Sequence, residues 1–444
     1  MNRNLITNIF SSFVDRAFVI LAMFGATILM IRFLPREDYG IIGVVAGYGA
    51  FVQVVNIALE NVILKEHKEY QENIEKYLLN FIIFSVAKSL IFLVIGIVLA
   101  MLLPSIYSEP GFYWAVLSLT LVLVGDSIIS PLVLYASTQY KQKWVTIVNV
   151  VRYSLNVVVL FGLIYWPSLS FVFVKDIIIT LSTLFIWWAV ARYTLSLDFS
   201  KVSIWKDVEP KFMWTSLTGY SFWVHMTAVA TNFIYRSDTI FLSFFCNLNV
   251  IGNYNVALTC ANTANIAPAI LGYHNSVGVS HAKTDKEAFE LTDKFLRLSI
   301  YVGFITLLGF LLLGNYYLQV VTGERGLDEV YWYLICIVAG LVLVKTIASP
   351  FVAYINVKGD VKRLFFRVNL PALVFTAVTY FLSAKYFGAV GVAVSNIIDA
   401  VVWGGLLWIE IRYYGYALPS ASGFISDIKW IIAKIPSLSG APSR

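Results

Sequence analysis

The sequence predicts an all-α polytopic membrane protein with about twelve transmembrane helices, and three observations lead to this fold class. Hydrophobic residues make up 59% of the 444 residues and charged residues only 13%, which lies outside the usual composition of water-soluble domains. Apolar runs of about 20 residues, enough to cross about 30 Å of hydrocarbon, recur along the chain. Lysine and arginine also gather in alternate loops. The bilayer is therefore the expected solvent.

Twelve segments have the length and apolar character of a transmembrane helix and lie between polar or Gly/Pro-containing turns. The first follows a short segment without a small-residue cleavage site, so we expect a retained span rather than a signal peptide. Residues 166–168 alone separate the fifth and sixth segments, which predicts an antiparallel hairpin. The predicted spans are 8–33, 40–63, 77–102, 113–138, 144–165, 169–191, 216–245, 252–278, 295–317, 330–355, 364–386 and 389–411.

The distribution of basic residues predicts the orientation of these spans. Of 32 Lys and Arg residues, 21 fall in loops and tails on one side, and four (Arg32, Arg36, Arg325 and Lys385) fall on the other. Because basic loops remain in the cytoplasm, both termini are predicted to be cytoplasmic. This asymmetry accounts for the net charge of +6, which therefore gives no reason to expect a nucleic-acid partner.

An internal repeat predicts two halves of six helices each. Residues 125–137 align with residues 344–356, with five of thirteen positions identical. The alignment makes Asp126 and Lys345 equivalent, so their opposite charges are candidates for a contact between the halves that forms and breaks during transport. The identities include Ser130-Pro131 with Ser349-Pro350, and Tyr135 with Tyr354.

The repeat and the longest loop together define four regions. A parallel repeat with an even number of helices places the two halves around an axis along the membrane normal, which is a transporter arrangement. The predicted regions are an N-terminal lobe (1–191), a cytoplasmic connector (192–215), a C-terminal lobe (216–412) and a cytoplasmic amphipathic tail (413–444).

Ionisable residues inside the spans are the candidate functional residues, because each costs about 3 kcal/mol or more at the bilayer centre unless it faces a partner or a watery cavity. The basic set suits a diphosphate, since guanidinium and ammonium groups bind phosphate oxygens. The acidic set supplies coupling-ion or counter-charge candidates. The basic candidates are Arg16, Lys88, Arg152, Arg236 and Lys345, and the acidic candidates are Asp15, Asp126, Asp176, Asp238 and Asp399.

Simpler roles remain open for several of these residues. Arg152 and Arg367 lie within about two turns of the predicted cytoplasmic ends, where a long side chain can snorkel to the interface. Lys88 lies near the middle of its span, so we expect it to face a water-filled cavity. Neighbouring opposite charges can also form local ion pairs, although consecutive residues do not face each other on a helix. These neighbours are Asp15–Arg16, Lys175–Asp176 and Arg236–Asp238.

Other kinds of site have little support in the sequence. The cysteines Cys246, Cys260 and Cys336 are far apart and lack metal-ligand spacing, so neither a metal site nor a disulfide framework is expected. No GxxxxGK[ST] motif is present, which argues against ATP hydrolysis. No cofactor or catalytic residue is therefore predicted.

Several short motifs occur in an order that resembles the polysaccharide-transporter, O-antigen flippase-type family of the multidrug/oligosaccharidyl-lipid/polysaccharide (MOP) exporter superfamily. The resemblance covers nearly the whole chain and rests on the order and spacing of these motifs together with twelve spans. The motifs are RFLPREDYGIIG (32–43), YASTQYKQK (135–143), RSDTIFLSFFCNLNVIGNY (236–254) and YINVKGDVKR (354–363).

This resemblance implies a function and a cellular location for the protein. It implies two lobes around a cationic cavity that opens alternately to the cytoplasm and the periplasm of a bacterial inner membrane. The implied cargo is an undecaprenyl-diphosphate-linked oligosaccharide repeat unit for O-antigen, lipopolysaccharide, capsule or a similar polysaccharide, and other assembly proteins are candidate partners. Arg16 matches the first-span arginines of related peptidoglycan-precursor flippases, which carry two further helices.

The energy source of transport and two alternative functions complete the prediction. A doubly anionic headgroup leaving a negative-inside cell gains about 2.3 kcal/mol per charge per 100 mV, so the membrane potential, a proton gradient or a sodium gradient are candidate energy sources. An ion-coupled multidrug or cation exporter of the same superfamily is the first alternative, although it should favour acidic cavity residues. A membrane polysaccharide polymerase is the second, but the predicted periplasmic loops 104–112 and 318–329 are short for catalysis.

Overall fold

A computed structural model describes residues 3–56, 63, 73–139, 141–199, 202, 208, 220–417 and 423–424, apart from the side chains of 3–17, 53, 220, 221, 266, 267, 269, 270, 273 and 277. The regular elements in these ranges are helical. The α-helices are α1 (Arg3–Phe33), α2 (Arg36–Val52), α4 (Ile74–Tyr107), α5 (Gly111–Thr138), α6 (Gln142–Leu160), α7 (Leu169–Ala189), α10 (Tyr220–Arg236), α11 (Asp238–Ser243), α12 (Leu248–Asn262), α13 (Ile266–His281), α14 (Asp285–Thr322), α15 (Asp328–Ile337), α16 (Lys345–Lys358), α17 (Val361–Leu364) and α18 (Leu370–Tyr413).

Short 3-10 and π-helical segments extend or join several of these helices. They are η1 (Gln53–Val55), η4 (Phe161–Ile164), η5 (Val190–Thr194), η7 (Thr263–Asn265), η8 (Val338–Val344) and η9 (Phe365–Asn369).

The predicted spans coincide with these helices wherever the structure describes them. Seven described helical stretches are long and apolar enough to cross a membrane, and Phe18–Phe33 in α1 is a shorter apolar one. The longest stretch, Val361–Tyr413, contains the last two predicted spans. Gly388, between those spans, has φ +59°, a conformation that only glycine adopts readily. The break between spans eleven and twelve is therefore a glycine kink in a nearly continuous helix.

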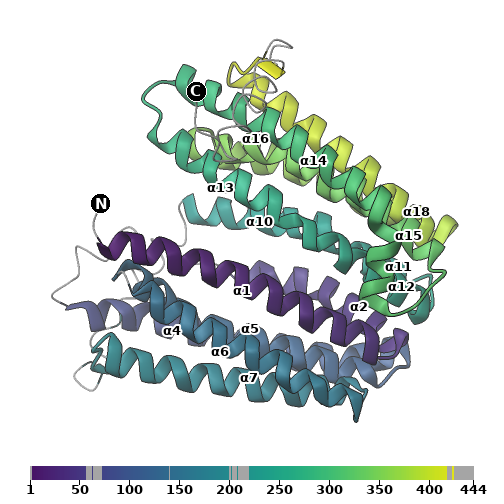
Figure 1. Cartoon of the computed structure of the whole chain (residues 1–444), viewed down its shortest axis with the longest axis horizontal. Coiled ribbons are helices and arrows are strands. Elements are labelled where there is room, and N and C mark those ends of the chain that lie inside the picture. The colour runs from purple at the N-terminus through teal and green to yellow at the C-terminus, as the bar shows by residue number, and fades with distance from the viewer. Residues whose placement is uncertain are drawn as a thin grey trace, which may run out of the picture.

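The helices form two bundles that lie side by side in Figure 1. In the first bundle, which contains α1 to α7, α4 packs on α5, α1 on α6 and α5 on α7. In the second, which contains α10 to α18, α16 packs on both α13 and α14. Most of the predicted connector (192–215) and tail (413–444) lies outside the described residues, so the proposed lobe boundaries remain predictions.

The two bundles are joined mainly where α2 crosses α12, and two glycines make this close approach possible. A Cβ atom on Gly40 would lie 2.3 Å from the carbonyl oxygen of Leu248. A Cβ atom on Gly252 would lie 2.1 Å from the carbonyl oxygen of Arg36. Both distances are far inside van der Waals contact with backbone atoms, so only glycine fits at these crossing points. We call this crossing the α2–α12 seam.

Polar contacts close the same end of the molecule, which the orientation rule predicts to be periplasmic. Arg36 forms an ion pair with Glu324 at 3.0 Å, and Arg32 donates to the carbonyl oxygen of Val321 at the end of α14 at 3.2 Å. Asn249 donates to Glu37 at 2.8 Å. The largest buried apolar cluster also draws on both bundles here, whereas the smaller clusters each belong to one bundle. The bundles therefore share a core at this end.

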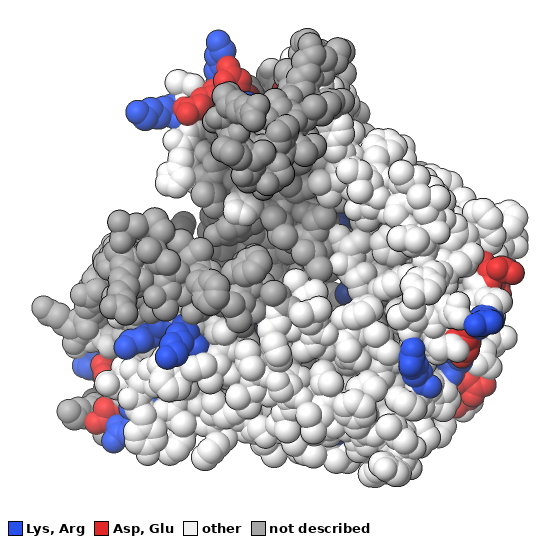
Figure 2. All heavy atoms as spheres, viewed as in Figure 1, with Lys and Arg blue, Asp and Glu red and all other residues white. Residues whose placement is uncertain are grey.

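The space-filling view agrees with a membrane protein. On the face shown in Figure 2, most of the coloured acidic and basic residues lie near the two ends of the helices, and the described surface between them is mainly uncharged. Such a band suits contact with the hydrocarbon of a bilayer.

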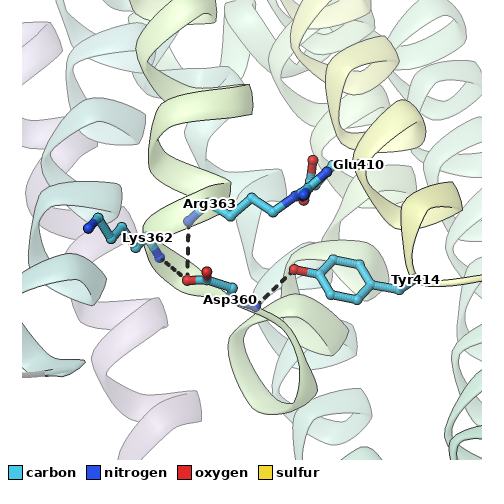
Figure 3. Close-up of polar contacts among 5 residues, drawn as sticks. All are labelled: Asp360, Lys362, Arg363, Glu410 and Tyr414. Carbon is cyan, nitrogen blue, oxygen red and sulfur yellow. Dashed lines mark hydrogen bonds and ion pairs between the residues drawn. The ribbon is translucent and has the colours of Figure 1, made fainter.

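At the predicted cytoplasmic end, a polar cluster fixes α17 against the end of α18 (Figure 3). The Asp360 carboxylate caps α17 by accepting from the backbone N–H groups of Lys362 and Arg363. The backbone N–H of Asp360 donates to the Tyr414 hydroxyl at 2.9 Å, and Arg363 donates to Glu410. The turn between spans ten and eleven is thereby anchored to span twelve.

Candidate functional site

Each bundle contains a cavity, and we call them the first-bundle and second-bundle cavities. The first-bundle cavity has a volume of about 380 Å³ and lies between α1, α2, α5, α6 and α7. The second-bundle cavity has a volume of about 320 Å³ and lies between α10, the α12–α13 junction, α16, η9 and α18. Both volumes fall near the lower end of the range for small-molecule sites, about 300–1,000 Å³.

Charges in the first-bundle cavity are paired with each other. The Arg152 guanidinium lies 2.7 Å from the Asp126 carboxylate, and the Lys175 ammonium lies 2.6 Å from Asp176. The Ser118 hydroxyl also donates to Asp176. The Asp126 side chain keeps 49% of its surface exposed, so its pair forms part of an accessible wall. The described lining of the cavity combines two cations with two anions, whose charges cancel.

The contact between Lys175 and Asp176 differs from our expectation for adjacent residues on a helix. Their Cα–Cβ bonds diverge, but the flexible four-carbon stem of lysine lets its ammonium fold back to the neighbouring carboxylate. Both side chains are buried, so ion pairing offsets part of the cost of placing the two charges there. The rule that consecutive helix residues do not face each other therefore does not prevent a contact here, because the long lysine side chain reaches the short aspartate beside it.

The second-bundle cavity contains an excess of positive charge. The Lys345 ammonium lies 4.4 Å from the centre of the Tyr235 ring, within the range of a cation–π interaction. Lys345 is the charged residue among the described residues that line this cavity. The described lining residues include hydroxyl and amide side chains but no aspartate or glutamate. This cavity can therefore attract an anion.

Local backbone features place these groups. The π-helical segment η8 directly precedes Lys345, and such segments change the register of the side chains that follow. The Tyr235 ring packs edge-on against Trp403, whose indole N–H donates to the Asn369 side chain at 3.1 Å. The lysine and its aromatic partner are thus held by contacts from α16, α10, α18 and η9.

The remaining basic candidates lie outside this arrangement or beyond the description. Lys88 is buried in α4 with 3% of its surface exposed, 5.8 Å from the centre of the Phe84 ring, and it lines neither cavity. Arg236 is exposed at the end of α10. Asp15 and Arg16 lie in α1, and their side chains are outside the described residues. The described cations are therefore divided between the bundles rather than gathered in one cavity.

The acidic candidates of the second bundle take part in hydrogen bonds. Asp238 is buried and accepts from the Tyr254 hydroxyl at 2.7 Å and from the backbone N–H of Thr239 at 2.8 Å. Asn396 donates to Tyr254 at 2.8 Å and accepts from Tyr380 at 2.7 Å, which extends the network to both segments of α18. The network ties α11 and α12 to α18.

Asp399 accepts from Thr379 at 2.6 Å, within α18. The predicted contact between Asp126 and Lys345 is not formed in this arrangement, because Asp126 pairs with Arg152 and Lys345 lies in the other bundle. The prolines that follow these two residues by five positions both lie inside helices, Pro131 in α5 and Pro350 in α16.

Sequence reasoning missed the polar and aromatic partners of the charged residues. Tyr235, Tyr254, Asn265 and Asn396 carry no charge, and hydroxyl and amide side chains are common throughout these spans. The one available signal for Tyr235 was its position beside Arg236. Selecting only ionisable residues therefore found the charges but not the groups that position them.

Comparison with known proteins identifies the fold. A model of the family described as "Polysaccharide biosynthesis protein" matches residues 5–279, more than half of the chain. No curated protein sequence matches. Among solved structures, the lipid II flippase MurJ in an inward closed conformation has a TM-score of 0.66 at 14% identity, covering 99% of this chain and 94% of its own.

Two multidrug-type transporters share the same architecture. The eukaryotic MATE transporter AtDTX14 has a TM-score of 0.60 at 13% identity, covering 91% of this chain and 96% of its own. A multidrug resistance MATE family transporter of the MOP superfamily, in an inward-facing conformation, has a TM-score of 0.57 at 13% identity, covering 91% and 98%. At these identities the likeness shows the fold, and it confirms the predicted all-α, multi-pass membrane architecture.

Proposed function

Because the chain belongs to the polysaccharide biosynthesis protein family of membrane transporters, we propose that it is a flippase for undecaprenyl-diphosphate-linked oligosaccharide repeat units. It carries them from the cytoplasmic to the periplasmic leaflet of a bacterial inner membrane by alternating access. The cargo serves O-antigen, capsule or a similar surface polysaccharide. Both termini lie in the cytoplasm, and other assembly proteins can act on the cargo before and after transport.

The excess positive charge of the second-bundle cavity is the observation that carries this proposal. Lys345 places a positive charge at membrane depth, and the described lining of the cavity supplies no acid to offset it. A diphosphate would satisfy this ammonium, because it presents several acceptor oxygens and two negative charges. In this proposal Lys345 and Arg236 hold the diphosphate, and the polyprenyl tail remains in lipid.

The paired charges have a different part in the proposal. Arg152 is neutralised by Asp126 in this arrangement, so it serves the first bundle rather than the resting diphosphate site. Arg16 and Lys88 remain candidates for contacts along the path, and Asp176, Asp238 and Asp399 for counter-charges or coupling ions. Outward movement of a doubly charged headgroup is favoured by about 2.3 kcal/mol per charge per 100 mV.

The sidedness of the lipid-linked oligosaccharide tests this function in the source cell. Membranes are compared with and without the protein, and the oligosaccharide on each leaflet is measured. We expect accumulation on the cytoplasmic leaflet when the protein is absent and recovery when it is restored. Unchanged sidedness with normal surface polysaccharide would reject the flippase and favour the ion-coupled exporter of small cations.

A further inference from the structure

The two bundles also meet along a second line, where α2 packs on α10 and α11. The residues of α2 and η1 that make these contacts are Gly43, Gly47, Phe51 and Val54, spaced by four, four and three positions. Residues with this spacing lie on one face of a helix. At about 1.5 Å per residue, the line covers about 16 Å, roughly half of the hydrocarbon thickness. One face of this helix therefore follows the second bundle deep into the membrane.

The first part of this line is a close approach of backbones. The Thr239 hydroxyl donates to the carbonyl oxygen of Gly43 at 2.9 Å. A Cβ atom on Gly47 would lie 2.7 Å from the Ile240 side chain and 3.0 Å from the carbonyl oxygen of Arg236. A larger residue at position 47 would push α2 away from the break between α10 and α11. Glycine thus permits the tight contact here.

The line continues toward the predicted cytoplasmic end. The rings of Phe51 and Phe233 pack edge to face with their centroids 4.8 Å apart. The Nε2 atom of His225 lies 2.9 Å from the Val54 carbonyl oxygen and must be the donor, because a carbonyl oxygen only accepts. Val54 lies in η1, the 3-10 turn that follows α2, and the last carbonyls of a helix need partners from outside it. His225 of the second bundle supplies this partner.

These contacts differ from those that close the predicted periplasmic end. The hydrogen bond between Asn249 and Glu37 is exposed, so water can replace either partner when they separate. The hydrogen bond between His225 and Val54 lies within the predicted seventh and second spans, where an unpaired backbone carbonyl is costly. The exposed polar contacts therefore separate more readily than the contacts between α2 and α10.

We propose that the contacts of Gly47, Phe51 and Val54 with α10 form a permanent joint between the bundles, which stays closed through the whole transport cycle. This inference rests on the proposed function, because it concerns the motion that this function requires. Cargo can leave only if the predicted periplasmic end opens, so the α2–α12 seam must separate. The bundles then pivot about the joint instead of parting along the whole length of α2.

Two cysteine pairs test the joint with the full-length protein in liposomes. Val54→Cys/His225→Cys lies across the joint. Glu37→Cys/Asn249→Cys is the matched control, because it also links α2 to the second bundle, but at the predicted periplasmic end. Each pair is linked with a short reducible thiol crosslinker. Transport of lipid-linked oligosaccharide is measured before linking, after linking and after reduction, with wild-type protein as the control for its three native cysteines.

The linked joint pair should keep the transport rate of its reduced form. The linked periplasmic pair should fall to the rate of liposomes without protein and recover on reduction. Loss of transport in the linked joint pair, or full transport in the linked periplasmic pair, would overturn the inference.

A measurement without cargo separates failure of the joint from failure of the proposed function. Spin labels on the same cysteine pairs are compared with and without Gly252→Ala, whose methyl group would lie 2.1 Å from the Arg36 carbonyl oxygen at the seam. The distance between labels at 37 and 249 should lengthen, and that between 54 and 225 should stay constant. Equal lengthening of both distances rejects the joint. Wild-type protein that shows this difference but moves no oligosaccharide rejects the proposed function and leaves the joint in place.

Discussion

The two bundles contain cavities of similar size, but the positive charges in these cavities have different kinds of partner. In the first-bundle cavity, Arg152 and Lys175 each contact a carboxylate. In the second-bundle cavity, Lys345 lies over the ring of Tyr235, and the described lining contains no aspartate or glutamate. A charge at membrane depth must be offset, and a partner in the protein does this permanently. A charge that meets no acid among the described residues leaves the cavity to be offset by a ligand.

The repeat shows where this difference lies. Asp126 and Lys345 occupy equivalent positions, five residues before the internal prolines of α5 and α16. Each half thus carries an internal helix proline at this place in the repeat, whereas the charge five residues earlier has the opposite sign. Changing one side chain at a repeated position can therefore turn a paired cavity into one that attracts anions.

Replacing Lys345 with glutamine should have the largest effect, because it removes the central charge of the second-bundle cavity. We expect transport of lipid-linked oligosaccharide into proteoliposomes to fall about 100-fold or more, which corresponds to about 2.7 kcal/mol. The thermal midpoint of the purified protein should stay constant or rise, since the lost charge has no acidic partner among the described lining residues. Lys345→Arg keeps the charge and should retain most transport. A glutamine variant that transports normally would contradict the assigned role.

Gly252→Ala should open the α2–α12 seam, which joins the two bundles at their predicted periplasmic end. The added methyl group would lie 2.1 Å from the Arg36 carbonyl oxygen, and such overpacking typically costs about 1–3 kcal/mol. Spin-label distances between the predicted periplasmic ends of α2 and α12 should lengthen. Gly309→Ala is the matched control, because nothing lies within 4 Å of its added methyl group. Unchanged distances in Gly252→Ala would show that the seam does not hold the closed end.

Asp126→Asn should lower the thermal stability of the protein, whereas Lys345→Gln should not. It leaves Arg152 without its carboxylate in the first-bundle cavity, and because Asp126 is half exposed, we expect about 1–2 kcal/mol rather than the full penalty of a buried pair. The double variant Asp126→Asn/Arg152→Gln should recover most of the loss in a thermal denaturation series. A double variant less stable than either single one would argue against simple charge compensation.

Glu324→Gln should have the smallest effect, since its ion pair with Arg36 is outside both cavities. The Glu324 side chain is 55% exposed, and exposed pairs contribute about 0–1 kcal/mol. The thermal midpoint should change little, and raising the salt concentration should remove the difference from wild type. A loss as large as that of Asp126→Asn would place this contact among the main supports of the closed end.

The sequence was sufficient for the spans because the requirement for a transmembrane helix is local. An apolar run of fixed length between polar turns identifies a crossing, whatever its neighbours are, and the described helices occur where these runs lie. The boundary between spans eleven and twelve was also visible at Gly388, although its kink geometry was not. The equivalence of α5 and α16 in the repeat stays a prediction, because it comes from aligned residues rather than from contacts.

The candidate site was predictable only in part. Charged residues at membrane depth stand out from an apolar background, and this contrast was enough to find Lys345, Arg236 and the acids of both bundles. It did not predict that Lys175 contacts its neighbour Asp176, or that Lys88 lines neither cavity. A side chain's reach and the direction of its helix face decide those contacts.

By itself, the sequence determined that the chain lives in a membrane, where its helices cross and which charges they carry, since each of these follows from nearby residues. Only the tertiary structure decided which charges are neutralised. Arg152 finds Asp126 on another helix, and Lys345 finds the ring of Tyr235 on a helix far away in the chain. Electrostatic and cation–π energies fall steeply with distance, so the packing of distant segments sets whether a buried charge is satisfied by the protein or left for a ligand.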